Sequence, residues 1–97
     1  MYDFEAELWL YSGDAAWHFV TVPAHVSDAI EARTAGARRG FGSVRVRVTC
    51  GSSTWDTSVF PDTRLGAYLL PVKKEIRRRE GLVAGDRVRV ALELVGD

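Results

Sequence analysis

The chain has 97 residues, of which 46% are hydrophobic and 27% charged, and its 13 basic residues balance 13 acidic ones. These values are typical of one small globular domain over residues 1–97 and exclude a disordered chain, while zero net charge weighs against a nucleic-acid-binding protein. A single cysteine, Cys50, excludes an internal disulfide, and no window reaches the ~18 apolar residues of a membrane span, so we predict a cytoplasmic protein.

The first two elements are predicted to be strands. Every second residue near the amino terminus is apolar and should face a core: Phe4, Ala6, Leu8 and Leu10. Trp9 alternates with these residues and should therefore point outward. After a turn at 12–14, a second strand over 17–22 should return antiparallel to the first and end at Pro23, which a central strand does not tolerate.

A short helix should follow Pro23, because apolar positions recur there with helical spacing. The residues that share one face of this helix are Val26, Ala29, Ile30 and Arg33. Residues 35–42 contain three glycines and are predicted to form a loop.

The clearest strand pattern lies at Val44–Cys50, where valines alternate with polar residues. A hairpin turn at 51–53 should lead into a strand over 54–60, in which Trp55, Thr57 and Val59 face inward. Residues 61–66 are then predicted to form a loop before a strand over 67–70.

The stretch LPVKKEIRRREGLVAGDRVRV, residues 70–90, predicts a helix, a stop and a last strand. Val72 and Ile76 lie four residues apart on one helical face, and Gly81 suits a left-handed C-cap. The arginines of the last turn meet the negative end of the helix dipole, and Glu75 forms an i,i+4 pair with Arg79. A structural role therefore accounts for much of this positive charge.

Charge is unevenly distributed along the chain. Residues 1–32 contain six acidic residues and no Lys or Arg, so all 13 basic residues lie from Arg33 onward. We expect the acidic first strand to pair with a basic strand, since opposite charges on facing strands contribute about 0.2 to 1 kcal/mol per pair.

Two parts of the chain share the order strand, short helix, strand. The first runs from 19–22 through Val26 to the strand at Val44, and the second from 69–72 through Ile76 to the strand at Val88. This repeat predicts two pseudo-twofold halves. With six to seven strands and two short helices, it favours a mainly β fold, a small closed or double-split β-barrel, because closure removes exposed sheet edges.

The stretch 70–90 resembles the swapped-hairpin signature of the AbrB and MazE group, LPKEIR…LGL…GD.V.V, in which Gly85 and Asp86 precede the last strand. Over its full length the chain more closely resembles a bacterial family called domain of unknown function 1905, which is related in fold to that group. Besides the Val-rich third strand, the positions that show this resemblance are Phe4, Glu5, Ala6, Leu8, Trp17, Phe19, Val20, Val22, Pro23, Val26, Thr57, Ser58, Pro61, Gly66, Ala67 and Tyr68. The resemblance implies a barrel completed within one chain, where AbrB-type proteins need two, and it implies no established activity.

Side chains with catalytic or metal-binding chemistry form no recognised motif. His18 and His25 are the only histidines, and no pair of His, Cys, Asp or Glu has metal-ligand spacing, so we predict no metal, no cofactor and no catalytic residue. The candidate binding residues are instead aromatic or cationic, with one histidine: Trp9, Trp17, His18, Tyr68, Lys73, Lys74, Arg77 and Arg78.

Three functions remain open, none of them at a membrane. The favoured one is a binding or accessory module for a small molecule or a protein partner, acting as a monomer or homodimer. The second is an AbrB-like DNA-binding regulator, whose affinity would fall steeply with salt. Its phosphate contacts would be Lys73, Lys74, Arg77, Arg78, Arg38, Arg39, Arg45 and Arg47. The third is a small enzyme with a pocket between barrel and helices, where His18, Arg77 and Tyr68 supply polar groups.

Overall fold

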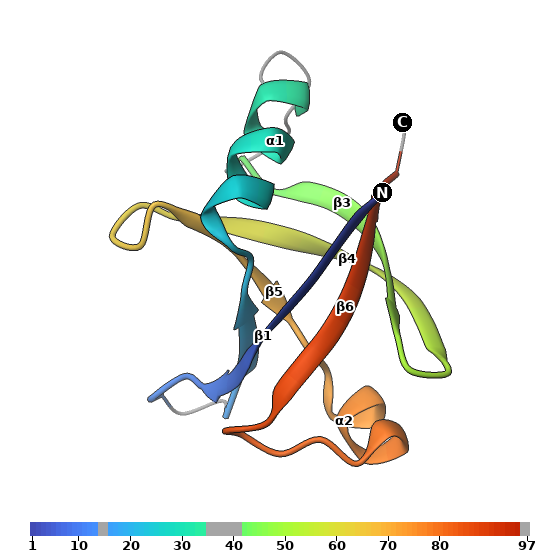
Figure 1. Ribbon diagram of the computed structural model, residues 1–97. Coiled ribbons are helices and arrows are strands. Elements are labelled where there is room, and N and C mark those ends of the chain that lie inside the picture. The colour runs from blue at the N-terminus through green and yellow to red at the C-terminus, as the bar shows by residue number, and fades with distance from the viewer. Residues whose placement is uncertain (14–15, 35–41, 96–97) are drawn as a thin grey trace.

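The computed structural model describes residues 1–13, 16–34 and 42–95, which form a closed antiparallel β-barrel with a short helix at each end (Figure 1). The elements in chain order are β1 (Tyr2–Leu10), β2 (His18–Thr21), α1 (Ala24–Thr34), β3 (Val44–Cys50), β4 (Ser53–Asp62), β5 (Ala67–Pro71), α2 (Lys74–Glu80) and β6 (Arg87–Leu94). Around the barrel the strands follow the order β1-β2-β5-β4-β3-β6, and β6 pairs with β1. The predicted mainly β barrel with two short helices is thus confirmed.

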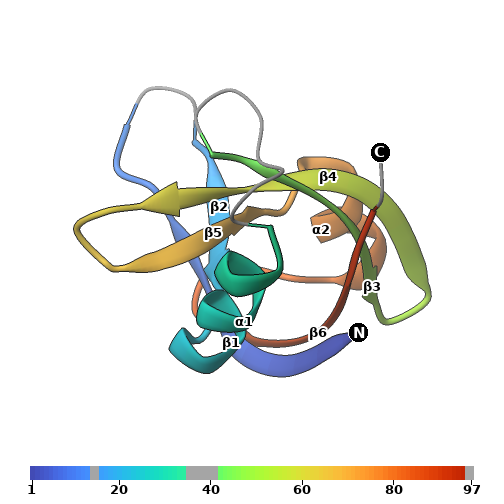
Figure 2. The ribbon, with the colours of Figure 1, turned by 90° about the horizontal axis from the view of Figure 1, so that it is seen from above.

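The barrel consists of two equivalent halves. Exchanging β1, β2 and β3 with β4, β5 and β6 leaves the order of strands around the barrel unchanged. Single hydrogen bonds repeat with a spacing of 50 residues: the Val22 N–H donates to the Tyr68 carbonyl (2.9 Å), and the Val72 N–H donates to the His18 carbonyl (3.0 Å). The helices obey the same spacing, since they begin at Ala24 and Lys74. Figure 2 shows α1 over one end of the barrel, and Figure 1 shows α2 at the other.

The core fills the barrel with every second strand residue and one face of each helix. Its apolar side chains with almost no exposed surface are Leu8, Val20, Val22, Ile30, Val46, Val48, Val59, Leu70, Ile76, Val90 and Leu92. Trp55 packs partly against this core, in agreement with its predicted inward direction. The prediction for Leu10 is wrong, because its side chain is 50% exposed. Leu10 ends β1 opposite His18, the first residue of β2, so no further strand residue covers it.

The acidic first strand lies against the basic last strand, as predicted. Glu5 is opposite Arg89, and Glu7 is opposite Arg87. The Arg87 Nε also lies 3.7 Å from Glu5 Oε1. These pairs are exposed and each contributes at most about 1 kcal/mol, so they favour the register of β1 and β6 more than the stability of the barrel.

The end of α2 also follows its sequence signals. Gly81 has a left-handed conformation (φ 67°, ψ 40°), and its N–H donates to the Arg77 carbonyl. The predicted ion pair within the helix is present, with Arg79 Nη2 2.9 Å from Glu75 Oε2.

Strand β4 extends further than predicted, because Pro61 and Asp62 belong to it and not to a loop. Pro61 is opposite Tyr68 in β5. The Tyr68 N–H donates to Ser27 and its carbonyl accepts from Val22, so neither group bonds to β4. Proline, which has no N–H, therefore loses no hydrogen bond between the strands at this position. The turn then occupies 63–66. The predicted loop at 35–42 falls largely outside the described residues, as does part of the predicted turn at 12–14. No helix in the described ranges is long and apolar enough to cross a membrane.

Candidate functional site

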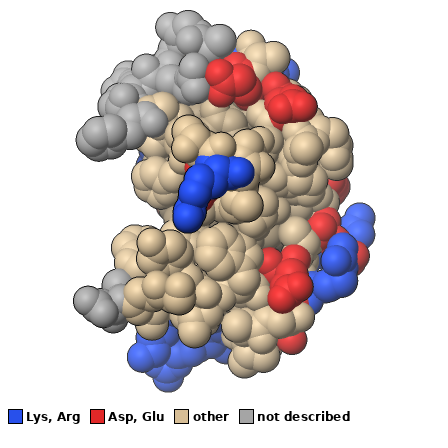
Figure 3. Space-filling model, turned by 90° about the vertical axis from the view of Figure 1, so that its left-hand side faces the viewer, with Lys and Arg blue, Asp and Glu red and all other residues tan. Residues whose placement is uncertain are grey.

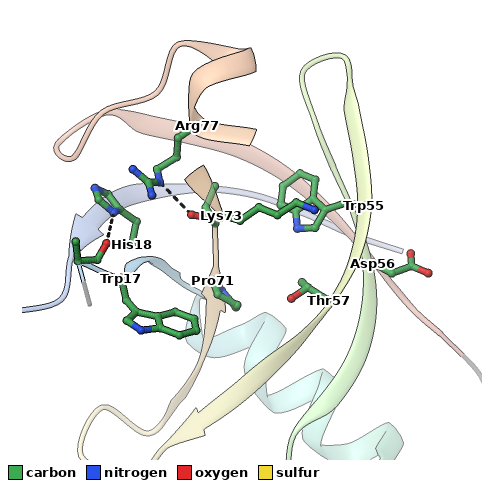
Figure 4. A pocket seen from close by; sticks show the side chains of 10 residues that line it. Trp17, His18, Trp55, Asp56, Thr57, Pro71, Lys73 and Arg77 are labelled. Carbon is green, nitrogen blue, oxygen red and sulfur yellow. Dashed lines mark hydrogen bonds between the residues drawn. The ribbon is translucent and has the colours of Figure 1, made fainter. Parts of the chain in front are cut away.

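A cleft of about 240 Å³ opens at the end of the barrel that α2 covers (Figure 4). Its walls come from the start of β2, the middle of β4, the end of β5 and the start of α2. The lining residues are Ala16, Trp17, His18, Trp55, Asp56, Thr57, Pro71, Val72, Lys73 and Arg77. The fold therefore brings together four of the predicted binding residues: Trp17, His18, Lys73 and Arg77.

Arg77 is held in the cleft by a hydrogen bond to the backbone. It lies one helical turn after Lys73, and its Nε–H donates to the Val72 carbonyl at 3.1 Å. Figure 4 shows its guanidinium group beside the ring of His18. Among the described residues, none accepts a hydrogen bond from the two terminal amino groups of Arg77. These groups are therefore free to bind an oxygen of a ligand.

The orientation of the His18 ring follows from its partner. Nδ1 lies 3.0 Å from the Ala16 carbonyl, which can only accept, so Nδ1 carries the proton of this hydrogen bond. Ala16 has φ 51°, a left-handed conformation that costs a non-glycine residue roughly 1 to 3 kcal/mol. The equivalent residue 50 positions later is Gly66, with φ 64°. The strained turn thus lies at the cleft and places a carbonyl against His18.

Two cationic side chains, Lys73 and Arg77, line the cleft. Lys73 Nζ also lies 3.8 Å from Glu75 Oε1, so Arg77 is the cation of the lining that has no carboxylate partner among the described residues. Figure 4 shows the Lys73 side chain extending toward Trp55, whereas the Asp56 carboxylate points away from the cleft. Asp56 instead binds Arg47 on the outer face of the barrel, with distances of 2.8 Å and 3.2 Å to Nε and Nη2. The hydrogen bond from Arg47 also lowers the pKa of the Asp56 carboxyl. The one carboxylate among the lining residues is therefore already neutralised outside the cleft.

The side-chain carboxylate of Glu80 connects α2 to the start of β4. The hydroxyl groups of Ser52 and Ser53 both donate to Glu80, and the hydrogen bond from Ser53 lowers the pKa of Glu80. Gly51 has φ 62°, a conformation that favours glycine, and a Cβ there would also press on the Glu80 carboxylate. These contacts hold the end of α2 against the start of β4, and both elements supply lining residues of the cleft.

Trp9 points outward, as predicted, but it does not line this cleft. Its side chain is half-buried, its indole N–H donates to Thr21 Oγ1 at 2.9 Å, and its ring lies 5.3 Å from that of Phe19. Trp17 stacks on the same phenylalanine at 5.9 Å and 9°, with 52% of its surface exposed. Trp9 thus covers its neighbours, while Trp17 borders the cleft.

Apolar side chains gather on the surface next to Trp17. A shallow hollow there is lined by Tyr11, Trp17, Phe19, Phe60 and Leu69. Figure 3 looks onto the side of the barrel where the β4–β5 turn lies, and it shows a broad uncharged surface around a basic side chain. We call the five residues of the hollow the aromatic patch.

The other predicted residues lie elsewhere. Tyr68 lies at the α1 end, where it is buried and its hydroxyl donates to Glu31 Oε1 at 2.9 Å. The structure therefore does not bring His18, Arg77 and Tyr68 together, which removes the polar trio of the enzyme hypothesis. Lys74 and Arg78 are exposed on α2, outside the lining of the cleft.

Trp55 and Thr57 line the cleft but were not predicted as site residues. The alternating pattern of the strand predicts that both side chains face inward. The sequence does not show that a cleft reaches these two positions. Within the described ranges, no three His, Cys, Asp or Glu side chains are placed to hold a metal ion. Cys50 is buried, and burial raises the pKa of its thiol, which disfavours the reactive thiolate.

A family model for DUF1905, a domain of unknown function, matches residues 4–92. The chain belongs to the DUF1905 family. The match spans both halves of the barrel and every residue that lines the cleft. The cleft is therefore part of the DUF1905 domain itself. No curated protein matches the chain.

Proposed function

We propose that this DUF1905 domain is a binding module whose cleft beside α2 takes a small molecule with an anionic group. One observation supports this proposal above all others. Arg77 and Lys73 lie on the cleft beside His18, while the carboxylate of Asp56 points away from it and binds Arg47. A guanidinium with free terminal amino groups is well suited to carboxylate or phosphate oxygens, and such charge-assisted hydrogen bonds are about twice as strong as neutral ones.

The rest of the lining limits what the ligand can be. A volume of about 240 Å³ is below the usual range for drug-sized ligands, so the ligand is a small metabolite or one group of a larger molecule. Trp17, Trp55 and Pro71 give the cleft flat apolar surfaces, on which an unsaturated or aliphatic group can pack. The cleft therefore favours a small organic anion over a highly charged polyanion.

The aromatic patch supports a second candidate, a protein partner. Exposed apolar patches of this kind mark interaction surfaces in many soluble proteins. Phe60 is 44% exposed and belongs to the patch but not to the lining of the cleft. A partner would therefore depend on Phe60, whereas an anion in the cleft would depend on Arg77.

The DNA-binding alternative has less support from the charges. Arg47 pairs with Asp56, Lys73 lies 3.8 Å from Glu75, and Arg77 is turned into the cleft. Arg38 and Arg39 lie outside the described residues. The basic side chains in the described ranges are therefore partly neutralised rather than aligned as a phosphate-binding surface.

Replacing Arg77 with Met should weaken the binding of anions at least tenfold, because it removes the charged donors of the cleft and keeps a long helix-forming side chain. A tenfold loss corresponds to about 1.4 kcal/mol, near the lower limit for a hydrogen bond to a charged group. The measurement is the fluorescence of Trp17 and Trp55 during titration with inorganic phosphate and, separately, benzoate at constant ionic strength.

The matched control is Arg78→Met, which removes the same charge from the next residue, on the exposed face of α2. It should change the affinity by less than twofold. Equal losses in both variants would show that binding depends on overall charge and not on the cleft. If neither anion binds the unmodified protein, the proposal that the cleft binds anions is wrong.

A further inference from the structure

The α1 end of the barrel contains a serine that bridges two strands. Strands β2 and β5 separate near Val22 and Tyr68, and the buried side chain of Ser27 fills the gap. Its hydroxyl oxygen accepts the Tyr68 N–H at 3.1 Å and donates to the Val22 carbonyl at 3.0 Å. One oxygen atom thus satisfies a buried donor and a buried acceptor.

The α2 end has the same geometry with a different side chain. Fifty residues after Ser27 lies Arg77, whose Nε–H donates to the Val72 carbonyl at 3.1 Å, as the Ser27 hydroxyl donates to Val22. A guanidinium has no acceptor, so Arg77 cannot accept the N–H of His18, the residue equivalent to Tyr68. The Tyr68 N–H thus has a side-chain acceptor at the α1 end, whereas the equivalent His18 N–H receives none from Arg77 at the α2 end.

The neighbouring strand β1 does not supply the missing acceptor. The Tyr11 N–H donates to the Trp17 carbonyl, so by the alternation of an antiparallel ladder Leu10 and His18 form a pair without mutual hydrogen bonds. On the side of β5, the Val72 N–H donates to the His18 carbonyl, but no reciprocal bond is made. Within the described ranges, no residue accepts a hydrogen bond from the His18 N–H.

We propose that a ligand oxygen accepts the hydrogen bond of the His18 N–H, as Ser27 Oγ accepts that of Tyr68 at the other end, while Arg77 Nε continues to donate to the Val72 carbonyl. This inference rests on the proposed function and makes it more specific. The ligand also accepts from the terminal amino groups of Arg77, and because these groups carry a positive charge, a carboxylate or phosphate is favoured over a neutral acceptor. An amine or another donor at this point would meet only donors and is excluded.

The first test follows the amide proton of His18 in the ¹⁵N-labelled protein during titration with inorganic phosphate and, separately, acetate. A new hydrogen bond to an anion should shift this proton downfield, and the shift should saturate together with the tryptophan fluorescence. If the fluorescence reports binding while the His18 amide proton does not move, the cleft binds anions and this inference is wrong. If nothing binds, the proposed function is wrong as well.

The second test compares Arg77→Ser with Arg77→Ala. A serine at 77 should reproduce the bridge made by Ser27, accepting from the His18 N–H and donating to Val72. Arg77→Ser should therefore melt at least about 4 °C above Arg77→Ala, as expected for roughly 1 kcal/mol in a domain of this size, while both lose at least tenfold in affinity for the better-bound anion. Equal melting temperatures would show that the two ends are not equivalent and would overturn the inference.

Discussion

Leu70→Ala is expected to lower the free energy of unfolding by about 3 to 5 kcal/mol. The Leu70 side chain has no exposed surface, and the residue pairs with Val20 where the two halves meet through β2 and β5. Removing three carbons there loses transfer free energy and leaves a cavity that the surrounding strands cannot close. Since small domains are stable by only about 5 to 15 kcal/mol, the variant should be partly unfolded in moderate denaturant. Urea unfolding followed by circular dichroism measures the loss.

The matched control for this leucine is Leu65→Ala. Leu65 lies in the turn between β4 and β5, and 56% of its surface is exposed. Its replacement should change the free energy of unfolding by less than about 0.5 kcal/mol. Similar losses for the two leucines would mean that the barrel interior is not the source of stability described above.

Ser27→Ala should lower the free energy of unfolding by about 2 to 6 kcal/mol, although it removes a single oxygen atom. The variant leaves the Tyr68 N–H and the Val22 carbonyl without their partner at a buried position, and each unsatisfied group costs about 1 to 3 kcal/mol. Thermal or chemical unfolding measures this loss.

Ser58→Ala serves as the reference for Ser27. The Ser58 hydroxyl accepts only a long 3.4 Å contact from Arg45 at the surface, so this change should stay within about 0.5 kcal/mol. If Ser27→Ala loses no more stability than Ser58→Ala, water replaces the Ser27 hydroxyl between Tyr68 and Val22. Ser27 would then not be needed to join β2 and β5.

Much of the fold could be predicted because it depends on local patterns. The alternation of valines at Val44–Cys50 indicates a half-buried strand, and Gly81 marks the end of a helix by its tolerance of positive φ. The repeated order of strand, helix and strand indicates the twofold relation, because each half must bury the same apolar face. These signals need no knowledge of which strands are neighbours.

The candidate site could be predicted only in part, because it depends on contacts between distant elements. Sequence chemistry identified Trp17, His18, Lys73 and Arg77, but it grouped them with Tyr68, which lies at the opposite end of the barrel. The alternation of apolar residues predicts which side chains of a strand face inward. The position of a residue along the barrel axis depends on the register between neighbouring strands, which the sequence pattern does not give.

The wrong prediction for Leu10 and the unpredicted role of Ser27 have the same physical origin. Leu10 follows the apolar alternation but lies beyond the last residue that could cover it. The alternating sequence pattern thus extends one residue beyond the buried part of the strand. Ser27 lies on the helix face of Val26 and Ile30 and is buried, yet the reason for a polar residue there appears only when the opening between β2 and β5 is known.

The two barrel ends have different residues at equivalent positions, Ser27 and Arg77, and these residues make different hydrogen bonds. At the α1 end, Ser27 closes the gap between the strands with an oxygen of the protein. At the α2 end, Arg77 binds the Val72 carbonyl but cannot accept from the His18 N–H, and both residues line the cleft. The α1 end also has a hollow, of about 200 Å³, but the charged residues that line it are acidic: Asp28, Glu31 and Asp62. The two ends therefore differ in the charge of their lining as well as in the residue beside the gap between the strands.

Anion binding in the cleft beside α2 can be located residue by residue from backbone amide shifts in the ¹⁵N-labelled protein. Saturation with phosphate or benzoate should shift the amides of residues 16–18, 55–57 and 72–77, while those near Tyr68 at the α1 end stay unchanged. Shifts confined to the exposed face of α2 around Lys74 and Arg78, or shifts of equal size at both ends of the barrel, would show that the cleft is not the anion-binding site.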